Sequence, residues 1–212
     1  MSEGLEKIDI PRRTVYRLSL YQRCLQRFLE EGRETVSSED LAHAAGVKPT
    51  QLRKDLGYVG QVGTRGLGYS VLTLSQAIAG IMGSTSLMPV ILVGVGNLGS
   101  ALLRYGGFRR EGFEIIAAFD ADVAGIKASQ EEVGIPMHDA ADLEHYVRDH
   151  DVSMAIVAVP EAAGQVVADV LVAGGVKAIL NFSPAVLNVP NEVYVNQVDL
   201  AAEMSSLSFF VN

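Results

Sequence analysis

The sequence predicts an α/β protein with two domains, a small helical domain followed by a doubly wound parallel sheet. Residues 13–82 carry several short helical patterns around a glycine-rich stretch. From Val90 onward, short apolar runs alternate with helical patterns, and the first run leads directly into the glycine turn Gly94–Gly99. Alternating strands and helices are typical of a parallel sheet covered on both faces.

Charge is divided unevenly along the 212-residue chain. Residues 1–80 contain 11 Lys and Arg against 9 Asp and Glu, whereas residues 81–212 contain 6 against 16. The net charges of +2 and −10 indicate two domains with different partners, of which only the first suits phosphates. The small-residue run 83–86 marks the boundary, giving domains of residues 1–84 and 85–212.

No segment predicts export or membrane insertion. The first residues contain no apolar signal-peptide core, and no apolar run is long enough to span a bilayer. The single Cys24 excludes an intrachain disulfide and fits a reducing compartment. These features predict a cytoplasmic protein without membrane contact.

Three helices are predicted at the start of the first domain. Apolar residues recur at helical spacing over residues 13–31. A second helix begins at the capping sequence Ser37–Asp40 and ends at Gly46. The third, Pro49–Leu56, has proline in its first position and Gly57 after its end. Two short helices joined by a turn that contains glycine form a helix-turn-helix unit.

The third helix has an apolar and a polar face. Leu52 and Leu56 point towards the other helices. The outer face carries Thr50, Arg53 and Lys54, with Gln51 at its flank. The major groove of DNA requires an outer face of this kind, and a solvated surface helix would show the same pattern.

A glycine-rich stretch, residues 58–69, follows this helix and has Tyr58 and Tyr69 at its ends. Glycines every two or three residues predict a β-hairpin, the wing of a winged helix, with a bare glycine loop as the alternative. Arg65 near the tip would contact phosphate or the minor groove. Residues 71–82 predict a fourth helix before the boundary.

The second domain opens on a strand, a glycine turn and a helix. The G-x-G-x-x-G spacing places the pyrophosphate of a dinucleotide on Gly94, Val95, Gly96, Asn97, Leu98 and Gly99. About twenty residues later a second strand ends in Asp120, the position of the acid that binds ribose hydroxyls. No Arg follows to receive a 2′-phosphate, which favours NAD(H) over NADP(H). A β-turn-α unit without ligand is the alternative.

The remaining elements alternate in the same way. We predict a polar helix over 138–150, a strand over 152–159, a helix over 161–173, strands over 176–180 and around 193–195, and a helix over 198–206. Carboxyl ends of parallel strands meet at one edge. Besides Gly94 and Asp120, the residues expected along this crevice are Val159, Pro160, Asn181, Phe182 and Ser183.

No group of residues predicts catalysis or a metal site. The residues after the glycine turn are consumed by the nucleotide-binding domain itself, which leaves no separate substrate domain. No Ser-His-Asp or Cys-His pairing is evident, and the four histidines lack metal-ligand spacing. The expected protein is therefore not an enzyme and holds no metal.

Three segments, QLRKDLGYVGQVGTRGLGY, VGVGNLG and ILNFSP, together resemble the Rex family of bacterial redox-sensing transcriptional repressors. The resemblance extends from about Arg17 to Phe210, and its first segment is the most specific. It implies a homodimer with a winged-helix DNA-binding domain and a Rossmann domain that binds NADH and NAD+. In this family NADH releases double-stranded operator DNA and NAD+ permits its binding, so repression responds to the NADH/NAD+ ratio.

The resemblance also implies roles for single positions. The implied DNA contacts are Lys48, Gln51, Arg53, Lys54, Tyr58 and Arg65. Asn181–Pro184 would lie near the nicotinamide. Three residues that exchange contacts between redox states in relatives correspond to Arg23, Tyr105 and Asp199, whose plain structural interpretations are a solvated charge, a core residue and a helix cap. Some relatives carry an aromatic residue where this chain has Leu200.

Two other function classes remain open from the sequence. A small NAD-dependent oxidoreductase with an accessory helical domain would turn over nicotinamide without binding DNA. A CoA- or nucleotide-binding module would use the helix-turn-helix only for dimerisation, and operator affinity in the isolated first domain would count against it.

Overall fold

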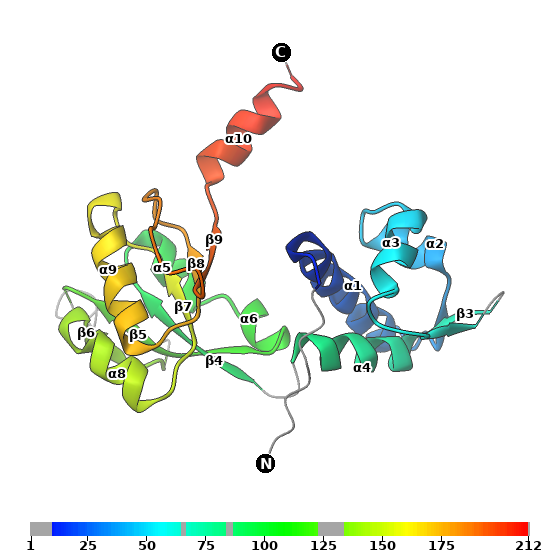
Figure 1. The fold of residues 1–212 in the computed structure, drawn as a ribbon, viewed down its shortest axis with the longest axis horizontal. Helices are drawn as coiled ribbons and strands as arrows, with labels where there is room; N and C mark the ends of the chain where they lie inside the picture. Colours follow the sequence, from blue (N-terminus) through cyan, green and yellow to red (C-terminus); the bar gives the residue numbers. More distant parts are fainter. Residues whose placement is uncertain (1–9, 65–66, 84–86, 123–133, 212) are drawn as a thin grey trace. The chain divides into compact units, whose positions relative to one another are not determined.

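The computed structural model describes residues 10–64, 67–83, 87–122 and 134–211 (Figure 1). The chain divides into two units, Met1–Ser86 and Leu87–Asn212. The first has one buried apolar cluster, and the second has one cluster on each face of its sheet. The predicted fold class, a winged helix followed by a Rossmann-type parallel sheet, is confirmed.

The first unit is built from four helices and a small antiparallel sheet. The helices are α1 (Arg12–Glu30), α2 (Ser38–Ala44), α3 (Pro49–Leu56) and α4 (Val71–Met82). The strands β1 (Thr35–Val36), β2 (Gly63–Thr64) and β3 (Gly68–Ser70) pair in the order β1-β3-β2. β2 and β3 form the predicted hairpin directly after α3, so the helix-turn-helix is followed by a wing.

Local sequence explains where these helices begin and end. The Ser37 hydroxyl accepts the Asp40 N–H at 3.0 Å and caps α2, as its capping sequence predicts. Pro49 occupies the first turn of α3, where no intrahelical donor is needed. α4 ends at Gly83 in the left-handed region, with φ of 69°. The inner faces of these helices bury a shared cluster that includes Leu18, Tyr21, Leu25, Leu41, Leu52, Leu56, Leu74 and Ile78.

The second unit is a six-stranded parallel sheet. In spatial order its strands are β6 (Met137–Asp139), β5 (Phe113–Asp120), β4 (Met88–Val93), β7 (Met154–Val157), β8 (Ala178–Asn181) and β9 (Tyr194–Gln197). Numbered within the unit, this is the order 3-2-1-4-5-6 of dinucleotide-binding sheets. The order reverses between β4 and β7, and the carboxyl ends of the strands at such a reversal are where sheets of this order bind their ligands.

Helices cover both faces of this sheet. α8 (Leu143–Asp149) and α9 (Glu161–Gly174) bury Leu143, Val147, Ala168 and Leu171 in one cluster. α5 (Asn97–Leu103) and α6 (Gly107–Arg110) contribute Leu103 and Phe108 to the cluster on the other face. Strands covered on both faces read as continuous apolar runs, which is why β4 and β5 were evident from the sequence.

The prediction of one helix over residues 138–150 is wrong. Met137–Asp139 is the edge strand β6, and His138 pairs with Phe119 of β5. The Asp139 carboxylate accepts the Ala141 N–H at 2.9 Å and starts the 3₁₀ turn Ala140–Asp142, which separates strand from helix. Only the second half of the segment is helical, as α8.

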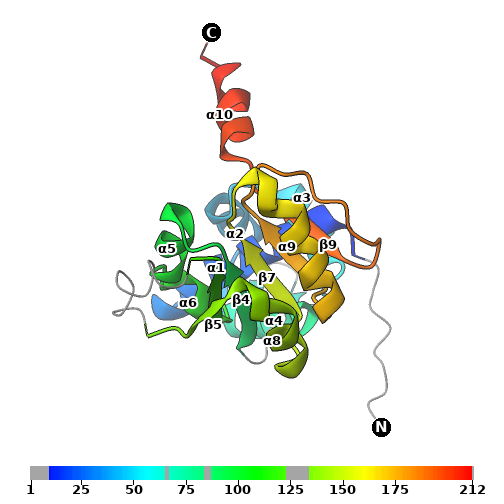
Figure 2. The ribbon, with the colours of Figure 1, turned by 90° about the vertical axis from the view of Figure 1, so that its left-hand side faces the viewer.

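The last helix, α10 (Leu200–Ser208), leaves the sheet after β9 and projects from it (Figures 1 and 2). Asp199 caps it by accepting the N–H groups of Ala201 and Ala202, both at 3.0 Å. None of its side chains is buried. Leu200, Met204 and Leu207 share one face of the helix and are 60–68% exposed.

Candidate functional site

The polar face of α3 lies where the sequence predicts it. Leu52 and Leu56 are buried, while Thr50, Arg53 and Lys54 are exposed. Exposed Lys48 stands at the N-cap of this helix, and Tyr58 beyond its C-terminus is half-buried. The structure therefore gathers most of the predicted DNA contacts on and beside one helix.

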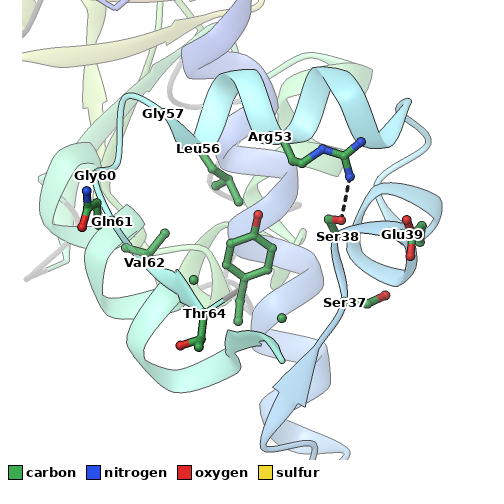
Figure 3. A pocket seen from close by; sticks show the side chains of 13 residues that line it. Ser37, Ser38, Glu39, Arg53, Leu56, Gly57, Gly60, Gln61, Val62 and Thr64 are labelled. Carbon is green, nitrogen blue, oxygen red and sulfur yellow. Dashed lines mark hydrogen bonds between the residues drawn. The ribbon is translucent and has the colours of Figure 1, made fainter. Parts of the chain in front are cut away.

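A cavity of about 570 Å³ separates α3 from the hairpin (Figure 3). It is lined by the start of α2, by Arg53 and by backbone of the glycine-rich stretch, including Gly57, Gly60 and Gly63. The Arg53 guanidinium donates to the Ser38 hydroxyl at 2.9 Å across the rim of this cavity (Figure 3). Arg65, the predicted wing contact, lies outside the described residues.

Beneath this surface, Asp55 ties α3 to α1. Its carboxylate, whose side chain is 1% exposed, accepts from Arg17 Nε at 2.6 Å and Arg17 Nη2 at 2.7 Å. It also accepts from the Tyr21 hydroxyl at 2.8 Å, from Gln51 Nε2 at 2.9 Å and from the Thr14 hydroxyl at 3.3 Å. Gln51, a predicted DNA contact, is thus half-buried and held by one of its own helix neighbours.

The network fixes the charges of its members. Burial disfavours the ionised form of Asp55, but the hydrogen bonds from Arg17, Tyr21 and Gln51 outweigh it and hold its pKa below the usual value. Burial and the neighbouring carboxylate raise the pKa of Tyr21, which therefore stays a neutral donor. The sequence patterns did not predict this hydrogen-bond network around Asp55. Asp55 occupies the inner stripe between Leu52 and Leu56, where a charge requires a buried partner, and that signal could have identified it.

In the second unit, the glycine turn has the geometry that its spacing predicts. Gly94 has φ of 94°, and a Cβ there would lie 2.6 Å from the Ala158 carbonyl oxygen. A Cβ on Gly99 would collide with the Gly94 carbonyl oxygen, so α5 packs closely on the turn. A Cβ on Gly96 would meet nothing within 4 Å. Two glycines thus serve the fold, and the exposed middle one leaves room beside the backbone.

Asp120 is fixed against this turn. One oxygen of its carboxylate accepts the Val95 N–H at 2.6 Å, and the other accepts the Asp122 N–H at 2.9 Å. β4 and β5 are neighbours in the sheet, which brings the turn and the acid together across 25 residues of sequence. Val95 is buried, whereas Asn97 and Leu98 are exposed on the first turn of α5.

The other predicted crevice residues lie at the ends of β7 and β8. Val159 is half-buried, and exposed Pro160 is the N-cap of α9. Asn181 is fully buried, and its side-chain Nδ2 donates to the backbone carbonyl of Ala185 at 2.9 Å and to the side-chain Oε1 of Gln197 at 2.7 Å. The side-chain Oδ1 of Asn181 accepts the Ser183 N–H at 3.0 Å, so Asn181 shapes the turn around half-buried Phe182.

The three residues matched to switching positions occupy separate elements. Arg23 is exposed on α1, and Asp199 is exposed at the start of α10. Tyr105 is 60% exposed after α5, which is against a core role, and it packs edge-to-face on Phe108 at 5.1 Å between ring centroids. Tyr105 also lines a cavity of about 470 Å³ beside β5.

Neither a metal-binding cluster nor a membrane-spanning helix occurs within the described residues. No group of three or more His, Cys, Asp or Glu side chains there could hold a metal ion. No helix in the described ranges has the length and apolar character needed to cross a membrane.

Two family models match the chain, one in each unit. Residues 9–57 match a model described as a putative DNA-binding protein N-terminus, and residues 85–185 match a CoA-binding domain. The first match ends at α3, and the second contains the glycine turn and Asp120.

Similarity to single proteins extends over both units. The redox-sensing transcriptional repressor Rex of Streptomyces coelicolor is 48% identical over 200 residues, which cover 94% of this chain and 77% of that protein. A crystal structure of RSP, a Rex-family repressor, with β-NAD+ and operator DNA superposes with a TM-score of 0.86 at 31% identity, covering 97% of this chain and 94% of RSP. RSP with β-NADH gives 0.82 at 29% identity, covering 97% and 96%.

Proposed function

The chain belongs to the Rex family of redox-sensing transcriptional repressors, and we propose that it acts as a cytoplasmic homodimer that binds operator DNA and is released by NADH. The observation that carries this proposal is that its similarity to the relatives spans both the helix–hairpin unit and the glycine-turn unit. A repressor of this kind needs a DNA reader and a cofactor sensor in one chain.

Operator binding is assigned to α3 and its surroundings. Arg53 and Lys54 are exposed on the outer face of α3, and Lys48 at its N-cap adds a third cation. We assign Gln51 and Tyr58 to the edge of the same surface, and Arg65 to the wing. In a dimer, two such helices would read half-sites about 34 Å apart or a multiple of that spacing.

The residues of the glycine turn fit a dinucleotide. Open space beside Gly96 permits a pyrophosphate to approach the backbone, while Gly94 and Gly99 close the turn. The N–H groups of Val95 and Asp122 hold the Asp120 carboxylate at the end of β5, which supports its assignment as the acceptor of ribose hydroxyls. Val159, Pro160 and the Phe182–Ser183 turn complete the crevice.

The redox signal arises at one end of the cofactor. When bound, the dinucleotide supplies a nicotinamide ring that is charged and planar when oxidised, and neutral and puckered when reduced. Pyrophosphate and ribose contacts are common to both forms, and a contact shared equally by two states shifts no equilibrium. Discrimination therefore belongs to groups near the ring, for which we propose Phe182, Tyr105 and residues of a partner subunit.

A homodimer is supported by α10. This helix projects from β9 with three large apolar side chains on one exposed face. We propose that a second copy covers this face, which would bring Asp199 of one subunit towards the other. Arg23, Tyr105 and Asp199 would then form the alternative contacts of the two redox states.

We assign no catalytic residue to the chain. Its relatives are named as repressors, which supports a function in binding and not in catalysis. A dehydrogenase would show NADH turnover with a small-molecule substrate and no operator binding.

The decisive experiment is fluorescence anisotropy with a palindromic Rex-type operator at fixed salt, titrated with NADH and then with NAD+. Release by NADH at a level where NAD+ leaves the complex intact is the expected result. Binding indifferent to both cofactors would remove the sensor role, and absence of binding would remove the repressor role.

The DNA assignment predicts a specific effect of Arg53→Ala. Loss of one good base contact costs about 1–3 kcal/mol, and loss of a phosphate contact lowers the salt slope by about one. Arg148→Ala on α8 removes an exposed arginine of the acidic unit and serves as the matched control. Unchanged affinity and salt slope for Arg53→Ala would contradict the assignment.

A further inference from the structure

The side chain of Gln51 is held in one orientation by its neighbour. Its Nε2 lies 2.9 Å from Asp55 Oδ1, one helical turn away on α3. The Asp55 carboxylate in turn accepts from Nε and Nη2, which form one edge of the Arg17 guanidinium, and from the Tyr21 hydroxyl. Gln51 therefore sits at the outer edge of a network whose inner members are buried in the helical core.

The chemistry of this network determines which end of the Gln51 amide faces inward. An arginine side chain stays protonated in proteins, so Arg17 provides hydrogen-bond donors only. The Asp55 carboxylate that it binds provides acceptors only. An amide can bind such a carboxylate only through its NH₂ group. The carbonyl oxygen of Gln51 is consequently turned away from Asp55, and one N–H of the amide stays available beside it.

The Gln51 amide therefore offers one acceptor, its carbonyl oxygen, and one donor, its second N–H. The four bases differ in how well their major-groove edges match these two groups. In the major groove adenine offers its N6 amino group as donor and N7 as acceptor. Guanine offers two acceptors, thymine one acceptor and a methyl group, and cytosine a single donor. Only adenine complements both groups of the amide.

We propose that Gln51 reads an adenine in each operator half-site, and that Asp55 is the positioning residue that fixes the amide for this base. The proposal rests on the proposed function, since it names the base class that α3 recognises. Lys54 and Arg53 on the same helix add positive charge to this surface, and Gln51 adds selectivity for adenine.

The test uses the full chain and operators with modified bases. Each adenine of both half-sites is replaced in turn by purine, which lacks the N6 amino group, and by 7-deazaadenine, which lacks the N7 acceptor. At one position both analogues are expected to weaken binding by about 10- to 100-fold, the range of one bidentate base contact. In Gln51→Met that position should become indifferent to both analogues, while the other positions keep their penalties.

Positioning by Asp55 is tested separately from its effect on stability. In Asp55→Asn the carboxamide can face Gln51 with either its oxygen or its NH₂, so both amide orientations are allowed and the adenine-over-guanine preference at that position should shrink. Arg17→Lys weakens the network but keeps the carboxylate, so it should lower the melting temperature and preserve the preference. Circular dichroism at the temperature of the binding assay establishes that each variant is folded.

The outcomes separate this inference from the proposed function. No operator binding by the unaltered chain would overturn the repressor role. Operator binding in which Gln51→Met keeps the penalty at every adenine would overturn the Gln51 assignment alone. A preference that is equal in Asp55→Asn and the unaltered chain would overturn the positioning role of Asp55.

Discussion

At the scale of single residues, Asp55 shows what a charge on the inner face of a helix requires. Its carboxylate is removed from water between Leu52 and Leu56, which is costly unless every oxygen lone pair is used. Arg17, Tyr21 and Gln51 use them, and they come from two helices. The Arg17–Asp55 ion pair therefore fixes the angle and register of α3 on α1 in a way that apolar contacts alone do not.

Breaking this pair should destabilise the first unit. Removal of the buried Asp55 carboxylate leaves the half-buried Arg17 guanidinium and the buried Tyr21 hydroxyl without their shared acceptor, so Asp55→Ala is expected to cost about 3 kcal/mol. Urea unfolding followed by circular dichroism measures the loss. Asp40→Ala, which removes an exposed carboxylate on α2, is the control and should cost at most about 1–2 kcal/mol as a lost capping contact.

The same pair gives the first unit a pH dependence. Because the pKa of Asp55 is lower in the folded chain than in the unfolded chain, its contribution is fully present above the unfolded value. That contribution disappears as the pH falls through the folded value, so it is lost progressively below about pH 4. The stability difference between the unaltered chain and Asp55→Asn should shrink from pH 7 to pH 3, and a constant difference would show that the charge is not involved.

At the scale of elements, the glycines of the turn Gly94–Gly99 have different roles: Gly94 and Gly99 are needed for the fold, and Gly96 leaves room for the ligand. Gly99→Ala would drive a methyl group into the Gly94 carbonyl oxygen and should cost several kcal/mol of stability, roughly the range of severe core mutations. Gly96→Ala adds a methyl group in open space at φ of −68° and should leave the melting temperature nearly unchanged. Its effect should instead be a weaker affinity for NADH, by about tenfold, which NADH fluorescence titration measures. Loss of stability in Gly96→Ala without loss of affinity would reverse these roles.

How far the sequence predicts the elements depends on their length. α3 and α4 have the predicted bounds because a cap, a proline or a glycine stands at each end. β6 was missed because three residues are too few to show the alternation of a strand, and β1 has only two. The glycine turn and Asp120 follow from spacing along the chain. The Arg17–Asp55 contact joins positions 38 apart, and no local pattern encodes that pairing.

At the scale of the whole molecule, the proposed dimer depends on α10. Leu207→Asp places a charge in the apolar face that we assign to the second copy, and it should convert the dimer to monomers in analytical ultracentrifugation. Operator affinity should fall with it, because one helix-turn-helix reads only one half-site. Ser205→Asp adds the same charge away from that face and should leave the dimer intact. A Leu207→Asp dimer as tight as the unaltered one would exclude α10 from the interface.

The exposed face of α10 also has a consequence for how much protein a cell must hold. Within its own chain this helix has no buried side chain, so packing inside one subunit stabilises it little. If a second copy provides that packing, dilution below the dimer dissociation constant unfolds α10 and separates the two DNA readers in one step, by mass action. The melting temperature should then rise with protein concentration. In a cell, a minimum number of copies would be required for repression, whatever the NADH/NAD+ ratio.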